Sequence, residues 1–597
     1  MKKTLYIFTL GFVLMLMSAC VKDFLQVPET TGTVDLDKVF STKLNAEAAL
    51  FNGYRRALGF GNRGDYDITY GTLGSLAGER GKGNNWHPTF DIAFGGTNAN
   101  RTVLSYGRIY TIVRSLWVVN ENIDKVPDMD ATLKTQIKAE TKGLAAFIYL
   151  FGLKGYGGIP LVKKALSPNE DLTAPRASVD ETVKYIVQLC DEAAVDLPSN
   201  WPPNQRGRLT KSAALAIKAQ TLMYAARPLF NSATPYLSLG ADNNLISYGS
   251  YSEDRWRNAI TATQAALAEA TAAGYKLINT GGAGPNVANP NALADYGTAT
   301  STPGNEEVIL AYQNQDTDAA RFRNLSGYWP QGDQKFNNQR NGLLGNFLPN
   351  YVKADGAPQD WPKAGDPAPR PASDYIARHM QMEPRFRADF AGPGIQSANN
   401  PNDNRWGPLS WFVHTQNRGF TPNFPNTYDW GQGVAWPTKF YYMAGGRLWM
   451  ELPLLRVAEL YLNLAEAYNE TGQTALALTN LNIIRNRAGL PSITETDKGK
   501  LRELIQREWA VEFYDENKRY FDVKHWRLPN IGNGIIGGPV YEFQFYIKNG
   551  GSASLPANLI QYWMSKTYDF YWNDKMHLEP FPQAEVNKKA VVQNPGY

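Results

Sequence analysis

Tryptophan recurs in glycine-, proline- and asparagine-rich stretches that also carry polar side chains. The stretches are KGNNWHP with Asn85 and Trp86, SGYWPQG with Tyr328 and Trp329, and NRWGPLSW with Trp406. A flat aromatic ring can pack against the apolar C–H face of a pyranose, and neighbouring amide, carboxylate and guanidinium groups can bind its hydroxyls. This combination indicates a sugar-binding surface on loops. Burial of these tryptophans in the small core of a loop-rich lobe is the open alternative.

Two further polar residues, Asp65 and Arg80, complete the predicted binding set. The ligand-binding residues that we predict are Asp65, Arg80, Asn85, Trp86, Tyr328, Trp329 and Trp406. Trp117, Trp256 and Trp509 lie instead in segments of helical periodicity, where we expect core packing.

The sequence lacks the motifs that are typical of metal and nucleophile sites, and its match to a nucleotide motif lies in an unsuitable context. The five histidines are scattered, and the sequence has no His-Glu-x-x-His, Cys-x-x-Cys or Gly-x-Ser-x-Gly. GFGNRG at 59–64 fits Gly-x-Gly-x-x-Gly, but it follows a helical segment, whereas a dinucleotide site follows a strand and opens a helix. We therefore predict no catalytic residue, no metal ligand and no cofactor.

Glu306 and Glu307 form the most suggestive carboxylate pair. Glycoside hydrolysis needs two carboxylates that face each other across the scissile bond. In EEVILAY the two residues open a strand, so their side chains should alternate between its faces. We expect a solvated strand edge here rather than a catalytic pair.

The N-terminus has the layout of an export signal. Lys2 and Lys3 precede an uncharged apolar run, 5–17, which is shorter than the about 20 residues that span a bilayer. MSAC at 17–20 is similar to a bacterial lipobox, in which the cysteine is acylated and the chain is cut before it. We predict lipid attachment at Cys20, with several acyl chains holding the protein at a membrane.

The remaining composition describes a large body with little net charge. Cutting before Cys20 leaves 578 residues with a formal charge of about +2 and no block of lysine or arginine, which argues against nucleic acid as a partner. Cys190 then has no cysteine partner, and we expect a buried, inert thiol.

Apolar residues recur with helical periodicity on both sides of a loop-rich stretch. The predicted helices are 44–58, 105–124, 132–153, 179–196, 211–229, 254–272, 454–470, 475–487 and 498–514. Between Lys276 and Met450 lie 17 of the 36 prolines and 7 of the 15 tryptophans, a composition typical of loops and short strands. Tyr468 and its neighbours in residues 461–481 match the spacing of a tetratricopeptide unit, in which the small Ala465 and Ala477 allow close helix packing.

Six segments follow from these patterns. They are a lipoprotein signal peptide (1–19), the lipidated cysteine with a tether (20–40), an N-terminal helical lobe of tetratricopeptide-like (TPR-like) pairs (41–275), a loop-rich variable lobe (276–450), C-terminal TPR-like helices (451–530) and a closing segment (531–597).

Five blocks, in order along the chain, resemble the SusD/RagB family of surface lipoproteins from the nutrient-uptake systems of Bacteroidota. They are Cys20 followed by DFL, KAETKGLAAFIYLFGLKGYGGIPLV (138–162), RVAELYLNLAEAYNETG…LNIIRNRAGLP (456–491), IQREWAVEFYDENKRYFDVKHWR (505–527) and LEPFPQAEVNKKAVVQNPGY (578–597). Arg507-Glu508 reverses the commoner order of the family, and Phe581 replaces the usual isoleucine.

The resemblance implies a mainly α fold of about four TPR-like helix pairs with a variable lobe inserted between them. It implies a lipid-anchored protein on the cell surface, at the outer membrane, that captures oligosaccharide without catalysis and delivers it to a SusC-like TonB-dependent transporter. In the family, sugar contacts come from loops after the first helix, where Trp86 lies, and from the variable lobe, where Tyr328, Trp329 and Trp406 lie.

The charged residues of the signature blocks have a simpler interpretation than ligand binding. We expect ion pairs on helix surfaces from Arg485, Arg487, Arg507, Glu512 and Asp522. Three other functions stay open: an oligopeptide receptor, a surface glycosidase, and a scaffold whose helical units bind only protein partners.

Overall fold

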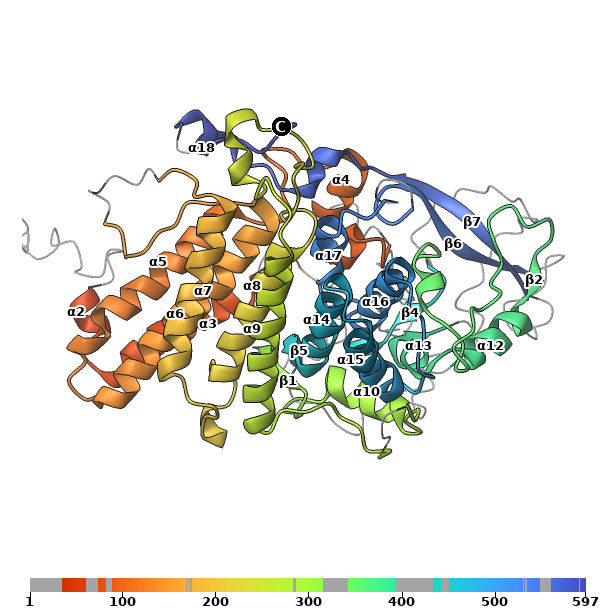
Figure 1. Ribbon diagram of the computed structural model, residues 1–597, viewed down its shortest axis with the longest axis horizontal. Coiled ribbons are helices and arrows are strands. Elements are labelled where there is room, and N and C mark those ends of the chain that lie inside the picture. The colour runs from red at the N-terminus through yellow and green to blue at the C-terminus, as the bar shows by residue number, and fades with distance from the viewer. Residues whose placement is uncertain are drawn as a thin grey trace, which may run out of the picture.

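A stack of long helices fills one side of the molecule, and short helices with small sheets fill the other (Figure 1). The computed structural model describes residues 35–60, 73–81, 88–167, 170, 174–282, 286–314, 342–392, 395, 433–441, 450–529, 531, 534–547, 560–589 and 591–597. The mainly helical fold predicted from the sequence is confirmed.

The N-terminal lobe consists almost entirely of helices. They are α2 (Leu36–Val39), α3 (Lys43–Leu58), η2 (Leu73–Leu76), α4 (Pro88–Gly95), α5 (Tyr106–Asn122), η3 (Ile123–Lys125), α6 (Ala131–Tyr156), α7 (Val179–Asp196), η4 (Pro203–Gln205), α8 (Lys211–Ala226), η5 (Gly240–Leu245) and α9 (Glu253–Ala272).

Local sequence explains where these helices begin. Asp130 accepts a hydrogen bond from the Leu133 amide at the start of α6, and Ser178 with Glu181 forms a capping box at the start of α7. Such side chains satisfy amides that have no partner within the helix. The periodicity of the apolar residues therefore predicts helix bounds to within a few residues, and those of α7 to the residue.

Later helices continue the stack across the middle of the molecule. They are α14 (Val457–Glu470), α15 (Thr474–Arg487), α16 (Lys498–Glu512) and α17 (Arg519–His525). Helix α9 packs against α14, and α14 packs against α15, so the stack is continuous although its halves are far apart in sequence (Figure 1). Ala465 and Ala477 are fully buried between helices, and Tyr468 accepts a hydrogen bond from Gln264 of α9.

A two-stranded ladder closes the base of the inserted segment. Strand β1 (Val308–Asn314) pairs antiparallel with β5 (Met450–Arg456), and Asn314 lies opposite Met450. The chain therefore leaves the helical stack and returns to it at one place. Because Met450–Arg456 is strand, α14 begins at Val457 and not at Leu454 as its periodicity suggested.

The remaining elements are short, as the composition of the segment predicts. They are α10 (Ala292–Ser301), η6 (Leu348–Asn350), β2 (Arg370–Pro371), α12 (Ala372–Gln381), α13 (Pro384–Asp389), β3 (Phe390–Ala391), β4 (Trp436–Pro437) and η8 (Lys439–Tyr441), followed near the C-terminus by β6 (Gly538–Ile547), β7 (Ile560–Phe570), η10 (Asp574–His577) and α18 (Gln583–Asn587). Strands β6 and β7 form a hairpin that β2 extends, and β3 pairs with β4.

The second lobe has its own core. Phe347, Trp361 and Tyr375 pack there with Tyr514 after α16 and Tyr562 of β7. The hairpin of the closing segment is thus part of this lobe (Figure 1). Burial of Trp361 shows that the loop-rich lobe does use one of its tryptophans for packing.

Several residues singled out in the sequence lie in the interior. Trp117, Trp256 and Trp509 are buried as expected. Cys190 is also buried, and burial raises the pKa of its thiol far above the usual range, which makes it inert. Within the described ranges, no helix is both long and apolar enough to cross a bilayer.

Candidate functional site

Of the predicted ligand-binding residues, Arg80 lies in the part of the chain that the structure describes. Asp65, Asn85, Trp86, Tyr328, Trp329 and Trp406 lie outside the described residues, as does Cys20. The described residues that flank these stretches show where the ends of the stretches lie.

Residues 79–81 and 342–344 are hydrogen-bonded neighbours. The Gly81 amide donates to the Gly342 carbonyl at 2.9 Å, and the Leu344 amide donates to the Glu79 carbonyl at 3.0 Å. Arg80 and Leu343 form an antiparallel bridge between these two bonds. The stretch 82–87, which contains Trp86, therefore begins where the stretch 315–341, which contains Trp329, ends.

Residues 433–435 join the same place. The Leu343 amide donates to the Ala435 carbonyl at 2.9 Å, and the Val434 amide donates to the Leu343 carbonyl at 2.7 Å. Gly433 has a φ of +119°, and a Cβ there would lie 2.5 Å from the Gly342 Cα, so the close approach requires glycine. We call residues 79–81, 342–344 and 433–435 the loop junction. Each of the stretches 82–87, 315–341 and 396–432 has one end at this junction.

Arg80 supports the junction from inside. Its side chain is fully buried, and Nη1 donates to Asp515 Oδ2 at 2.5 Å. The sequence placed Arg80 at the rim of a sugar site, but in the structure its guanidinium has no access to solvent. A buried arginine needs a carboxylate partner, and Asp515 supplies one from the turn after α16.

Glu79 is buried beside this pair. The Asp515 amide donates to Glu79 Oε2 at 3.4 Å. Burial raises the pKa of Glu79 to about 8, with Arg519 opposing the rise and Asp515 adding to it. The carboxyl is therefore mostly protonated at neutral pH, so that Glu79 adds little negative charge to the interior of the junction.

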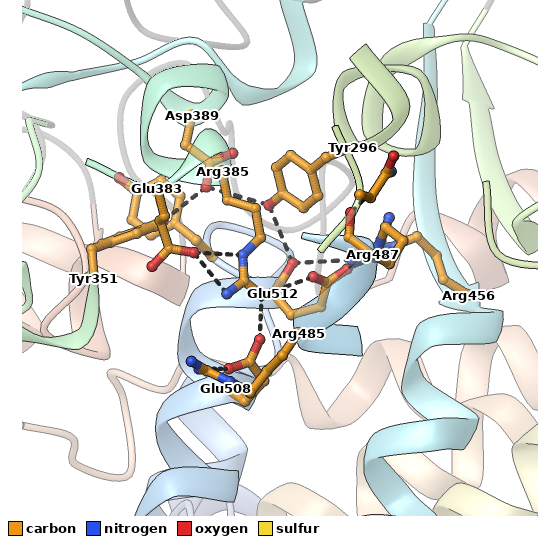
Figure 2. A network of polar contacts seen from close by, with 12 residues as sticks. Tyr296, Tyr351, Glu383, Arg385, Asp389, Arg456, Arg485, Arg487, Glu508 and Glu512 are labelled. Carbon is orange, nitrogen blue, oxygen red and sulfur yellow. Dashed lines mark hydrogen bonds and ion pairs between the residues drawn. The ribbon is translucent and has the colours of Figure 1, made fainter. Parts of the chain in front are cut away.

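A buried ion-pair network connects the two lobes next to the junction (Figure 2). Its centre is Glu512 of α16, whose carboxylate pairs with Arg385 of α13 at 3.1 Å, with Arg456 at the end of β5 at 3.0 Å, and with Arg487 at the end of α15. Burial opposes ionisation, but these arginines outweigh it and lower the pKa of Glu512 to about 2.

Neighbouring carboxylates extend the network in both directions. Glu508 pairs with Arg385 at 2.6 Å and with Arg485 at 3.0 Å. Glu516 pairs with Arg456 at 2.7 Å and with Lys439 at 2.9 Å. Because Arg385 and Lys439 belong to the inserted segment, while the carboxylates belong to α16 and the turn after it, the network joins the loop-rich lobe to the helices.

Glu307, the residue just before β1, joins the network. It pairs with Arg456 at 2.7 Å and with Arg487 at 3.2 Å, whereas Glu306 is exposed and pairs with Lys276 at 3.3 Å. The expected alternation of the two side chains is confirmed. The expectation of a solvated edge is correct for Glu306 and wrong for Glu307.

Four of the five charged residues predicted on helix surfaces are buried instead, which corrects the sequence interpretation, whereas Arg507 is partly exposed. Arg485, Arg487 and Glu512 belong to the network, and Asp522 pairs with the buried Arg227 at 2.6 Å. Arg507 has no ion pair among the described residues. Other elements cover these helices on several sides. A charged helix face that periodicity assigns to solvent is therefore buried against another element.

Asp389 marks the edge of the network that faces the second core. Tyr351 donates to Asp389 Oδ2 at 2.8 Å and Tyr296 donates to it at 3.3 Å (Figure 2). Burial raises the pKa of Asp389 to about 7, against the influence of Lys439 and of both hydroxyls. We assign these contacts a structural role and no ligand-binding role, because Asp389, Tyr296 and Tyr351 are all buried and contact one another.

Sequence reasoning missed the residues that form the junction and its support. Gly342 and Gly433 stand among many glycines, and Arg385, Lys439 and Arg456 lie in unrelated segments. The one signal available was charge within apolar text, as in ELPLLRVAEL around Arg456. A buried charge in such a run implies partners but does not name them.

Metal binding finds little support in the described residues. No group of three or more histidine, cysteine, aspartate or glutamate side chains there is placed to hold an ion. His379 and His577 are buried, and burial lowers the pKa of His379 to about 3 and that of His577 to about 4, so both are neutral packing residues.

Known proteins are similar to this chain in sequence and in fold. The SusD family model matches residues 306–597. A SusD-like protein of Formosa agariphila is 22% identical over 434 residues, which are 70% of this chain and 69% of that protein. A SusD-like protein from Bacteroides fragilis has a crystal structure with a TM-score of 0.72 and 22% identity, covering 95% of this chain and 100% of that chain. A laminarin-binding SusD-like protein has a TM-score of 0.53 and 17% identity, with coverage of 94% and 100%.

Proposed function

The chain belongs to the SusD family through residues 306–597, and on that premise we propose that it is a non-catalytic oligosaccharide-binding protein of the cell surface. In this proposal Trp86, Trp329 and Trp406 stack on sugar rings, with Tyr328 beside them, and Asn85 and Asp65 bind hydroxyls. The laminarin-binding relative supports a glycan as the ligand class. Stacking with a few hydrogen bonds on an open surface gives affinities on the order of micromolar.

The observation that carries the proposal is the loop junction. The stretch with Trp86 is more than 200 residues from the two stretches with Trp329 and Trp406, yet each of the three has an end within the same set of backbone hydrogen bonds. Trp86 is five residues from Gly81, a reach of at most ~18 Å. Convergence of loops on a rigid support is the usual way to build a binding site from aromatic side chains.

The positions of Glu306 and Glu307, the candidate carboxylate pair from the sequence, disfavour hydrolysis. Glu307 is buried and holds two arginines, while Glu306 points to solvent on the opposite face. The two carboxylates cannot flank one glycosidic bond. We therefore propose capture without catalysis.

Anchoring and delivery complete the proposal. Acylation of Cys20 would hold the protein at the outer membrane, with 21–40 as a tether to the helical lobe. Weak capture suits handover to a SusC-like TonB-dependent transporter as partner. Replacement of Cys20 by serine is expected to move the protein from the membrane fraction to the soluble fraction, and retention in the membrane would contradict the anchor.

Calorimetry with residues 21–597 tests the ligand. We expect binding to one class in a panel of plant, microbial and host glycans, with at least a tenfold loss of affinity in Trp86→Ala and Trp329→Ala. Tyr251→Ala removes an exposed ring at the start of α9 and should leave affinity unchanged, which makes it the matched control.

Other outcomes of the same panel identify the alternatives. Binding to a peptide digest alone would indicate an oligopeptide receptor. Release of sugar from a glycan would indicate a glycosidase. No binding to either class would leave a scaffold that binds only protein partners.

A further inference from the structure

A cavity opens next to the loop junction, beside α16 and α17. It has a volume of about 280 Å³ and is lined by residues of α16, of 346–350 and of 526–535, and by Gly78 and Arg519. Gly78 is two residues before Arg80, and Asn346 is three residues after Leu343. The larger of these separations spans at most ~11 Å along the chain.

Arg507 of α16 reaches this cavity without a partner of its own. Glu508, the next residue, turns into the network, whereas Arg507 has neither a hydrogen bond nor an ion pair with any residue that the structure describes. Burial lowers the pKa of Arg507, and Glu508 only partly offsets this. Arg385, Arg456 and Arg487, by contrast, each pair with at least two carboxylates.

Arg519 brings a second guanidinium to the same cavity. Its Nε donates to the Ala77 carbonyl at 3.3 Å, and its Cζ lies 5.0 Å from the centre of the Phe347 ring. Glu79 and Asp522 act on it electrostatically, but Asp522 is already paired with Arg227, and Glu79 is mostly protonated at neutral pH. Within the described part of the chain, no carboxylate contacts Arg519.

The other polar groups of the lining favour an anion. Gln506, next to Arg507, has an amide with no protein partner among the described residues, and the Asn350 amide donates only to the Phe347 carbonyl at 2.8 Å. Glu503 is the one carboxylate in the lining, and its side chain is exposed one helical turn before Arg507. Two guanidinium groups thus face a cavity in which a negative charge is missing.

We propose that this cavity binds an oxyanion, the carboxylate of a uronic acid or a sulfate ester, through Arg507 and Arg519. A guanidinium offers parallel N–H donors that match such a group, and a partly desolvated site strengthens the charge-assisted bonds. This inference rests on the proposed glycan binding. The site would select acidic oligosaccharides, because it lies a short distance along the chain from the stretches whose aromatic residues would stack on the sugar rings.

Small probes test the cavity separately from the loops. Residues 21–597 are titrated by calorimetry with sodium sulfate, sodium glucuronate and glucose at constant ionic strength. We expect both anions to bind and glucose not to bind. Preference for sulfate or for glucuronate would distinguish the two sources of the anion, and equal binding of glucose, or no heat with either anion, would overturn the proposal.

Variants assign the binding to the cavity. Arg507→Gln should weaken anion binding at least tenfold, whereas Arg257→Gln, which removes the same charge from an exposed position on α9, should not change it. Glu503→Gln should strengthen binding because it removes the negative charge at the mouth, a gain that misfolding cannot produce. An unchanged affinity in Arg507→Gln would overturn the proposal.

The loop variants keep this result distinct from glycan binding. Trp86→Ala should lose oligosaccharide affinity and keep the affinity for sulfate or glucuronate. Loss of anion binding in Trp86→Ala would mean that the loops, and not the cavity, hold the anion.

Discussion

Glu306 and Glu307 are adjacent residues with opposite roles. Glu307 is buried and joins Arg456 and Arg487, and its side chain also accepts from the Ile278 amide at 3.2 Å. Glu306 lies on the other face and pairs with an exposed lysine. Both residues lie in the turn just before β1, and one step along this turn decides between a buried network and solvent.

The pair offers a matched test of the network. Glu307→Gln should lower the free energy of unfolding by about 3–5 kcal/mol, because two buried arginines lose a carboxylate. Glu306→Gln should change it by less than about 0.5 kcal/mol, since exposed pairs contribute little. Urea unfolding of both variants, followed by circular dichroism, measures the difference. Equal effects would mean that the network is not a source of stability.

At the scale of elements, the β1–β5 ladder and the loop junction have the same role, which is to hold together segments that are distant in the sequence. Each joins by backbone hydrogen bonds residues that are far apart in the chain, so the stretches between them can vary without moving these residues. The junction also needs close approach of Gly433 and Gly342. Elements with few side-chain requirements can in this way support loops of many sequences.

Substitution of the junction glycine tests this role. Gly433→Ala should cost more than about 1 kcal/mol and should weaken glycan binding, because its Cβ would meet the Gly342 backbone. Gly365→Ala is the control, since Gly365 has a φ of +89° and open space around it. Thermal unfolding and calorimetry compare the two. If Gly365→Ala costs as much, backbone strain alone explains the effect and close approach does not matter.

At the scale of the whole molecule, the network makes the two lobes one unit. Arg385 and Lys439 come from the inserted segment, and their carboxylate partners Glu508, Glu512 and Glu516 come from α16 and the turn after it. Separation of the lobes would leave these charges unpaired in a partly buried surface. Such a cost exceeds what an ordinary interface between domains requires.

The lobes should therefore unfold together. Differential scanning calorimetry of residues 21–597 is expected to show one transition, with a calorimetric enthalpy equal to the van't Hoff enthalpy. Arg385→Gln should lower the temperature of that transition without splitting it, if the hydrophobic contacts of the second core still couple the lobes. Two separate peaks in the unmodified protein would contradict the single unit.

The long helices could be predicted from the sequence because helix signals are local. Periodicity and capping residues act within a few positions, so helices such as α7 and α9 follow from their own segments. The five signature blocks and the MSAC motif are likewise readable one segment at a time, and they indicated the family before the fold was known. The buried tryptophans of the helices followed from the same periodicity.

The support of the candidate site depended on the tertiary structure. Arg80 and Asp515 are separated by 435 positions, and Gly81 and Gly433 meet through Gly342 and its neighbours. No local pattern states which carboxylate an arginine will meet, or that a polar residue on a predicted helix surface is covered by another element. The sequence by itself determined the elements and the types of residue available for binding. Only tertiary packing decided which charges are buried together and which segments meet at the loop junction, because those contacts join residues that are distant in the chain.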